Sequence, residues 1–273
     1  MKIYISVDME GITGVAVQPQ VLETHTLYKR ACDFMVGDVN AAIEGALEAG
    51  AHEILVNDGH NHMMNLDLGA LNPVARLISG ENKPLLQMEG VQDCDIAFFI
   101  GYHSKSGSQE ATLDHSYWAS LVSAVSVNGV DVGEAEFNAL LAGEFDVPVV
   151  LLSGDEATCA SARSFIGEWL ETAAVKRSIG RESAVCLHPE LTAQLIRDAA
   201  TKAVMAGSSA RPCKANLPIT LDIEFFKSSM ADQAAVFPGA RRLDARSVRV
   251  EADSVERAYR LMLTLFALAR NAL

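Results

Sequence analysis

The stretch that decides the fold is KIYISVDMEG, residues 2–11. Apolar side chains alternate from Ile3 to Val7, which is the two-residue period of a strand, and two acidic residues follow directly. The next short apolar run, residues 54–56, is typical of a buried parallel strand. Residues 27–48, between the two runs, carry apolar side chains at helical spacing. Strand, helix and strand together predict a βαβ unit.

The same alternation of strands and helices continues along the chain. We predict, in order, a strand at 94–102, a strand pair around Asn128 and Gly129, a helix at 134–144, a strand at 147–153 and a helix that begins near Asp155. Short apolar strands between amphipathic helices favour an α/β fold. We therefore predict a layered α/β domain with a largely parallel sheet, over residues 1–185.

The last part of the chain has a different pattern. A helix is expected at 189–205, a Gly-Ser-Ser-Ala linker at 207–210, strands at 217–225 and 246–251, and a closing helix within 253–273. These elements predict a second, smaller α+β subdomain, residues 186–273, packed on the first domain.

The composition argues against several classes of protein. Of the 273 residues, 49% are hydrophobic and 21% are charged, which is ordinary for a globular protein. The net charge of -13 makes nucleic acids and anionic membranes poor partners. The apolar runs are much shorter than the roughly 20 residues of a membrane-spanning helix. The N-terminal segment lacks a signal-peptide pattern, and the five cysteines are scattered, so we expect a cytoplasmic protein.

Polar side chains follow three of the predicted strands. Asp8 and Glu10 follow the first strand, His60 follows the second, and His103 follows the strand at 94–102. The carboxyl ends of parallel strands meet at one edge of a sheet, so we expect these side chains to lie close together. Carboxylates with imidazoles are the ligands of zinc and other hydrolytic metal ions. Gly11 permits the turn that would bring both carboxylates to one site.

Each candidate also has a simpler explanation. Asp8 could cap a helix, His60 could lie in a polar loop, and His103 could be a hydrogen-bonded core histidine. His115 and Glu134 could complete a metal site, but His115 could equally lie on the surface. Glu134 opens a predicted helix, where a carboxylate complements the helix dipole. The coincidence of donors at three strand ends favours the metal site.

Five short motifs, in order and approximate spacing, resemble the binuclear-zinc D-aminopeptidase family associated with dipeptide transport. They are SVDMEG at 6–11, VNDGH at 56–60, GYH at 101–103, HS at 115–116 and VGE at 132–134. Further segments between and after them, among them SGD at 153–155 and TAAVK at 172–176, also resemble the family, so the likeness runs nearly from end to end.

The resemblance implies two zinc ions per subunit and His115 as the catalytic residue. The ligands that it implies are Asp8 bridging both ions, His60 and Glu134 on one ion, and Glu10 and His103 on the other. It also implies a homo-oligomer, a decameric ring whose central channel admits only small peptides.

Three hypotheses about function follow. The first is an aminopeptidase that hydrolyses N-terminal D-amino acids from short peptides or amides through a metal-activated hydroxide. In it His115 exchanges a proton or stabilises the oxyanion. The second is a metal-dependent amidase or phosphoesterase acting on a small metabolite. The third is a metal-stabilised binding or assembly protein without turnover. Dinucleotide and serine-hydrolase motifs of the G-x-G-x-x-G and G-x-S-x-G type do not occur.

Overall fold

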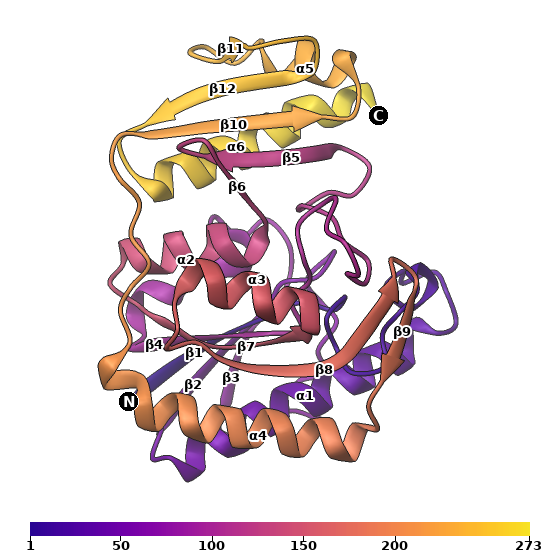
Figure 1. Cartoon of the computed structure of the whole chain (residues 1–273), viewed down its shortest axis with the longest axis vertical. Coiled ribbons are helices and arrows are strands. Elements are labelled where there is room, and N and C mark those ends of the chain that lie inside the picture. Colours follow the sequence, from indigo (N-terminus) through magenta and orange to yellow (C-terminus); the bar gives the residue numbers. More distant parts are fainter.

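A seven-stranded sheet forms the larger layer of the protein, with the order β3-β2-β1-β4-β7-β8-β9 (Figure 1). The computed structural model describes the backbone of residues 1–273 and every side chain except that of Ser208. The strands are β1 (Lys2–Val7), β2 (Glu53–Asp58), β3 (Ala75–Ile78), β4 (Ile96–Ile100), β7 (Val149–Asp155), β8 (Glu171–Gly180) and β9 (Ser183–Cys186). Neighbouring strands are parallel except for β8 and β9. The predicted α/β fold with a largely parallel sheet is confirmed.

Four helices cover the two faces of this sheet. α1 (Tyr28–Glu48) and α4 (Pro189–Ala206) pack together on one face, and α2 (Glu134–Glu144) and α3 (Glu156–Ile166) cover the other (Figure 1). Successive residues of a strand point to opposite faces, so β1 contributes to two separate apolar clusters. Its odd-numbered residues pack beneath α1 and α4, whereas Tyr4 packs in the cluster that contains α2.

A five-stranded antiparallel sheet forms the second layer, with the order β11-β12-β10-β5-β6. Its strands are β5 (Val122–Val127), β6 (Val130–Val132), β10 (Ile219–Phe225), β11 (Arg241–Arg242) and β12 (Ser247–Ala252). β5 and β6 form the predicted hairpin, with φ of 52° at Asn128 and 79° at Gly129, as a tight hairpin turn requires. The helices α5 (Ser228–Ala234) and α6 (Val255–Ala269) pack on this sheet.

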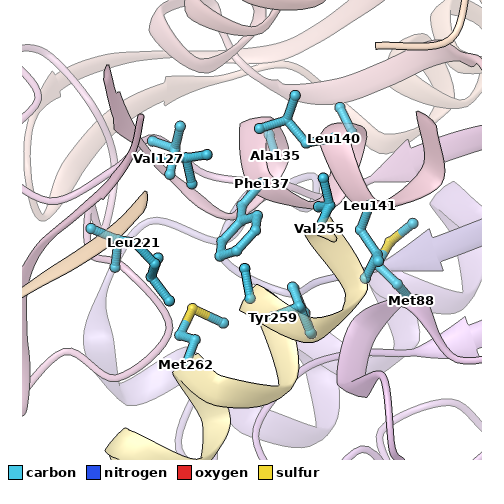
Figure 2. Packing of buried hydrophobic residues seen from close by; sticks show 14 of the residues in the cluster. Met88, Val127, Ala135, Phe137, Leu140, Leu141, Leu221, Val255, Tyr259 and Met262 are labelled. Carbon is cyan, nitrogen blue, oxygen red and sulfur yellow. The ribbon is translucent and has the colours of Figure 1, made fainter. Parts of the chain in front are cut away.

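Helix α2 joins the two layers through apolar side chains. In Figure 2, Phe137 of α2 lies among Tyr259 and Met262 of α6 and Leu221 of β10. The rings of Phe137 and Tyr259 meet edge to face, with centroids 5.2 Å apart. Every residue of α2 from Glu134 through Gly143 is buried. The first turn of α2 is therefore held firmly between the layers.

The two layers do not follow the predicted boundary at residue 185. β5 and β6 come from residues 1–185 but lie in the second sheet, and α4 comes from residues 186–273 but packs on α1. Gly45 of α1 permits this packing, because a Cβ there would lie 2.2 Å from the Arg197 carbonyl oxygen. The chain crosses between layers more than once, so a single cut cannot separate them. The division into a domain of residues 1–185 and a subdomain of residues 186–273 packed on it stays a prediction.

The sequence pattern missed β3, β8, β9, α5 and β11, and β8 shows the reason. Lys176 occupies a buried position in this strand, where an apolar residue is expected. Its Nζ donates hydrogen bonds to the carbonyl oxygens of Glu10 (2.6 Å), Ile12 (3.0 Å) and Val15 (2.5 Å). The partners that make this burial possible lie far away in the chain, so local periodicity does not reveal the strand.

Candidate metal centre

The ends of three neighbouring strands bring the predicted donors to one edge of the larger sheet. β1 pairs in parallel with β2 on one side and with β4 on the other. Asp8 follows β1 directly, and His60 and His103 lie within the first three residues after β2 and β4. All three side chains are buried. The clustering expected from the strand pattern is present.

Glu10 reaches the same place because the chain turns directly after β1. The Gly11 amide donates a hydrogen bond to the Gly101 carbonyl oxygen at 2.8 Å. A Cβ on Gly11 would lie 1.9 Å from the Tyr102 carbonyl oxygen, so no larger residue fits without a shift of the backbone. This close approach lets Asp8 and Glu10 both point into the cluster, although they are only two residues apart.

The donor atoms of five predicted ligands lie close to one another. His60 Nδ1 is 3.3 Å from Asp8 Oδ1 and 3.1 Å from Glu10 Oε2. His103 Nε2 is 3.2 Å from Asp8 Oδ2 and 3.2 Å from Glu134 Oε1. Asp8 lies at the middle of the cluster, with one carboxylate oxygen toward each imidazole. Glu134 lies in the first turn of α2, so a side chain of the helix between the two layers completes the cluster.

His115 lies at the rim of this cluster. Its ring stacks on the ring of His103, with centroids 4.0 Å apart and an interplanar angle of 11°. His115 Nε2 is 3.8 Å from Glu134 Oε1. The His115 side chain is 15% exposed, whereas those of the five other residues are at most 9% exposed. Among the six, His115 is the most accessible to a substrate.

The three histidines are oriented by backbone carbonyl groups. The contacts are His60 Nε2 to Val21 O (3.0 Å), His103 Nδ1 to Ser104 O (3.0 Å) and His115 Nδ1 to Leu113 O (2.9 Å). A carbonyl oxygen only accepts, so the ring nitrogen in each contact carries the proton. When a ring is neutral, its other nitrogen presents a lone pair to the cluster, which is how metal-binding histidines are held.

Negative charge is concentrated in this buried cluster. Burial alone raises the pKa of Asp8, but the adjacent imidazoles of His103 and His60 outweigh it and hold the pKa well below its usual value. For His103 the signs are reversed. Burial lowers the pKa of its imidazole, but the carboxylates of Glu134 and Asp8 raise it well above its usual value. The carboxylates therefore require positive charge beside them, which imidazolium groups or bound cations can supply.

The donor set fits a zinc site. Among the described atoms, Asp8 Oδ2, Glu10 Oε2 and His103 Nε2 are buried without a hydrogen-bond partner. Such atoms are rare in proteins, and these three carry lone pairs that a cation can use. Two groups of donors, Asp8 with Glu10 and His103, and His103 with His115 and Glu134, have their ligand atoms within 4.8 Å of one another. Oxygen and imidazole nitrogen are ordinary zinc ligands.

Sequence reasoning missed the groups that hold Glu134 in place. Gln87, in the short 3-10 helix η2 (Leu86–Met88), donates from Nε2 to Glu134 Oε2. The Tyr117 amide donates to Glu134 Oε1 at 2.6 Å. Neither residue belongs to a recognisable metal motif, and Gln87 is 47 residues away from Glu134 in the chain. No local signal could have identified these contacts.

Comparisons with known proteins give descriptions that agree with one another. A protein-family model described as D-aminopeptidase matches residues 1–264. A D-aminopeptidase of Bacillus subtilis (strain 168) is 35% identical over 271 residues, which cover 98% of this chain and 98% of that protein. A solved structure, described as the Zn-dependent D-aminopeptidase DppA from Bacillus subtilis, a self-compartmentalizing protease, superposes with a TM-score of 0.96. It is 34% identical, and the match covers 99% of this chain and 98% of that chain.

Proposed function

The chain belongs to the D-aminopeptidase family, and from this we propose that it is a zinc-dependent hydrolase that removes N-terminal D-amino acids from short peptides or amides. The observation that carries the proposal is the cluster of three carboxylates and three histidines, buried except for His115 at its rim, in which donor atoms remain without hydrogen-bond partners. The comparisons do not favour the amidase or phosphoesterase alternative, nor a binding protein without turnover.

We propose two zinc ions per subunit, bridged by Asp8. The contact of one Asp8 oxygen with each imidazole supports the bridging role. His60 and Glu134 would hold one ion, and Glu10 and His103 the other. The three-donor group of Asp8, Glu10 and His103 supports the second half of this grouping. The short contacts of His60 with Glu10 and of His103 with Glu134 cut across it. Zinc at these donors supplies Lewis acidity, which polarises the carbonyl of the bond to be cleaved and lowers the pKa of water.

His115 is the residue that we propose exchanges a proton with the substrate. Its Nδ1–H is held by the Leu113 carbonyl oxygen, so Nε2 is the nitrogen free to accept or return a proton. Its position at the rim of the cluster supports this role. Its inclusion in a donor group with His103 and Glu134 supports a second role, as a zinc ligand. A His115→Ala variant separates the roles, because loss of a ligand weakens zinc binding.

We further propose a homo-oligomer that encloses its active sites. The similar solved structure is described as self-compartmentalizing, and the family resemblance implies a ring of ten chains that admits small peptides. Sedimentation velocity tests this proposal. A single species with the mass of ten chains is expected, and a monomer at micromolar concentration would contradict it.

The compartment of the protein remains a separate proposal. Among the described residues, no helix has both the length and the hydropathy required to cross a membrane. All five cysteines are free thiols, which fits the reducing cytoplasm that we propose. Fractionation of cells that express the protein would test this location directly.

The decisive experiment compares matched D-alanyl and L-alanyl peptides. Zinc-loaded and chelator-stripped protein are assayed in parallel, and the metal content of each sample is measured. Cleavage of the D series alone, lost on stripping and restored by zinc, is expected. If zinc remains bound and neither series is cleaved, the peptidase proposal fails and the metal site stands.

A further inference from the structure

The carboxylate of Glu134 is held by two donors that come from different parts of the chain. Oε2 accepts a hydrogen bond from Gln87 Nε2, and Oε1 accepts one from the Tyr117 amide at 2.6 Å. Oε1 is also the oxygen that faces His103 Nε2, at 3.2 Å. Gln87 thus donates a hydrogen bond to one oxygen of Glu134, and the other oxygen points into the metal cluster.

Gln87 is itself held in a single orientation. Its Oε1 accepts a hydrogen bond from Asn138 Nδ2 at 2.8 Å, and its backbone carbonyl accepts from Tyr4 OH and Ser6 Oγ, both at 2.8 Å. A carboxylate only accepts hydrogen bonds, so the amide of Gln87 must present its NH₂ group to Glu134. The contact with Asn138 then satisfies the opposite end of the same amide. These contacts make a reversed amide unfavourable.

Close packing also restrains the side chain of Gln87. It is only 3% exposed. A Cβ added to Gly59 would lie 3.0 Å from Gln87 Cγ and 2.7 Å from the Val7 carbonyl oxygen. The loop that carries His60 therefore lies directly against Gln87, and the Gln87 side chain has little room to turn away from Glu134.

We infer that Gln87 is a positioning residue, which orients Glu134 for zinc binding by occupying its Oε2. The inference rests on the proposed function, because it takes Glu134 as a zinc ligand. Hydrogen-bond partners of metal ligands fix the ligand rotamer and tune its basicity, and their removal commonly weakens metal binding by about 10- to 100-fold. Without Gln87, Glu134 Oε2 would be buried without its donor, and the carboxylate could rotate.

The test compares Gln87→Met with Tyr4→Phe. Methionine preserves the length of the side chain but removes the donor to Glu134. Tyr4→Phe removes one of two hydrogen bonds to the Gln87 carbonyl oxygen, and Ser6 Oγ and the side-chain contacts of Gln87 remain to hold it. Zinc affinity is measured by competition with a chromophoric chelator, and the ligand geometry by the visible absorption of cobalt(II)-loaded protein. We expect zinc to bind Gln87→Met about 10- to 100-fold more weakly, with an altered cobalt spectrum. Tyr4→Phe should lower the melting temperature and leave both metal measurements unchanged.

The outcomes separate positioning from general stability. Wild-type zinc affinity and an unchanged cobalt spectrum in Gln87→Met would overturn the inference, as would an equal loss of affinity in Tyr4→Phe. If Gln87→Met fails to fold, Gln87→Asn, which retains an amide but is too short for Glu134, should show the same weakening. Zinc affinity does not depend on peptide cleavage, so the inference is decided even if the wild type cleaves no D-peptide.

Discussion

Charged side chains are arranged in opposite ways in the two sheets. At the edge of the seven-stranded sheet, Asp8 and Glu10 are buried and have oxygen atoms without hydrogen-bond partners among the described atoms. On the five-stranded sheet, Asp222 accepts two hydrogen bonds from Arg249, both of 2.6 Å, and both side chains remain partly exposed. Buried charge is costly, whereas exposed pairs contribute little. The buried carboxylates are therefore kept for chemistry, whereas the exposed pair is compatible with solvation alone.

The largest expected effect comes from His115→Ala, which should slow peptide hydrolysis at the buried cluster of the seven-stranded sheet and leave the fold intact. Loss of a general acid or base commonly costs about 10²- to 10⁴-fold in rate. We expect kcat for a D-alanyl peptide to fall by that factor. The variant should bind as much zinc as the wild type. Activity near wild type with zinc bound would refute the catalytic role, and loss of zinc would assign His115 as a ligand.

A second large effect is expected for Gly11→Ala, which disturbs the turn behind the cluster. Its Cβ would lie 1.9 Å from the Tyr102 carbonyl oxygen, so the backbone must shift. We expect the free energy of unfolding to fall by about 3 kcal/mol or more in urea denaturation.

Gly37→Ala is the matched control for this substitution. Gly37 is an exposed residue of α1, and nothing lies within 4 Å of an added Cβ. The free energy of unfolding should rise by about 0.5–1 kcal/mol, because alanine favours a helix. Equal destabilisation by both variants would show that close approach at Gly11 is not the cause.

An intermediate effect, visible as pH dependence, is expected from Asp38 behind the loop that carries Glu10. Burial raises the pKa of Asp38 to about 6, although Thr13 donates two hydrogen bonds to it and the charge of Lys176 acts in the opposite direction. The folded state therefore binds more protons than the unfolded state between about pH 4 and 6. The free energy of unfolding should fall as pH rises through this window, by up to about 3 kcal/mol.

Asp38→Asn should remove this pH dependence, because the amide does not ionise. Urea denaturation of both proteins from pH 4 to 7 measures it. The variant should gain stability relative to the wild type as pH rises to 6. A constant difference across the range would contradict a raised pKa in the wild type.

The smallest effect is expected on the second sheet, from Arg249→Ala. Its partner Asp222 remains partly exposed to water, so neither charge is left buried. The free energy of unfolding should change little, and less at high salt, in urea denaturation at two ionic strengths. A large loss of unfolding free energy that persists at high salt would contradict the contrast between the two sheets. It would mean that the exposed charge pair contributes strongly to the stability of the second sheet.

Local sequence patterns were sufficient to predict the strand ends and the kind of side chain that follows them. Alternating or continuous apolar residues marked β1, β2 and β4, and the polar residues after them, Asp8, His60 and His103, were predicted to meet. This prediction needs only short-range periodicity and the rule that parallel strands end at one edge. The proposed roles of His115 and Glu134 depended on the family resemblance, because spacing alone left their alternatives open.

The contacts that hold these residues in place depend on the packing of distant segments. Lys176 is buried in β8 because three carbonyl groups, the farthest 166 residues away, accept its hydrogen bonds. Gln87 donates a hydrogen bond to Glu134, which is 47 residues away in the chain. Helix α4 lies within residues 186–273 of the sequence but packs on α1. Local patterns record which face of an element is apolar, but not which distant partner satisfies a buried polar group. Those partners are chosen by the packing of the whole chain, because a buried polar atom must find its hydrogen bond wherever the fold brings one near.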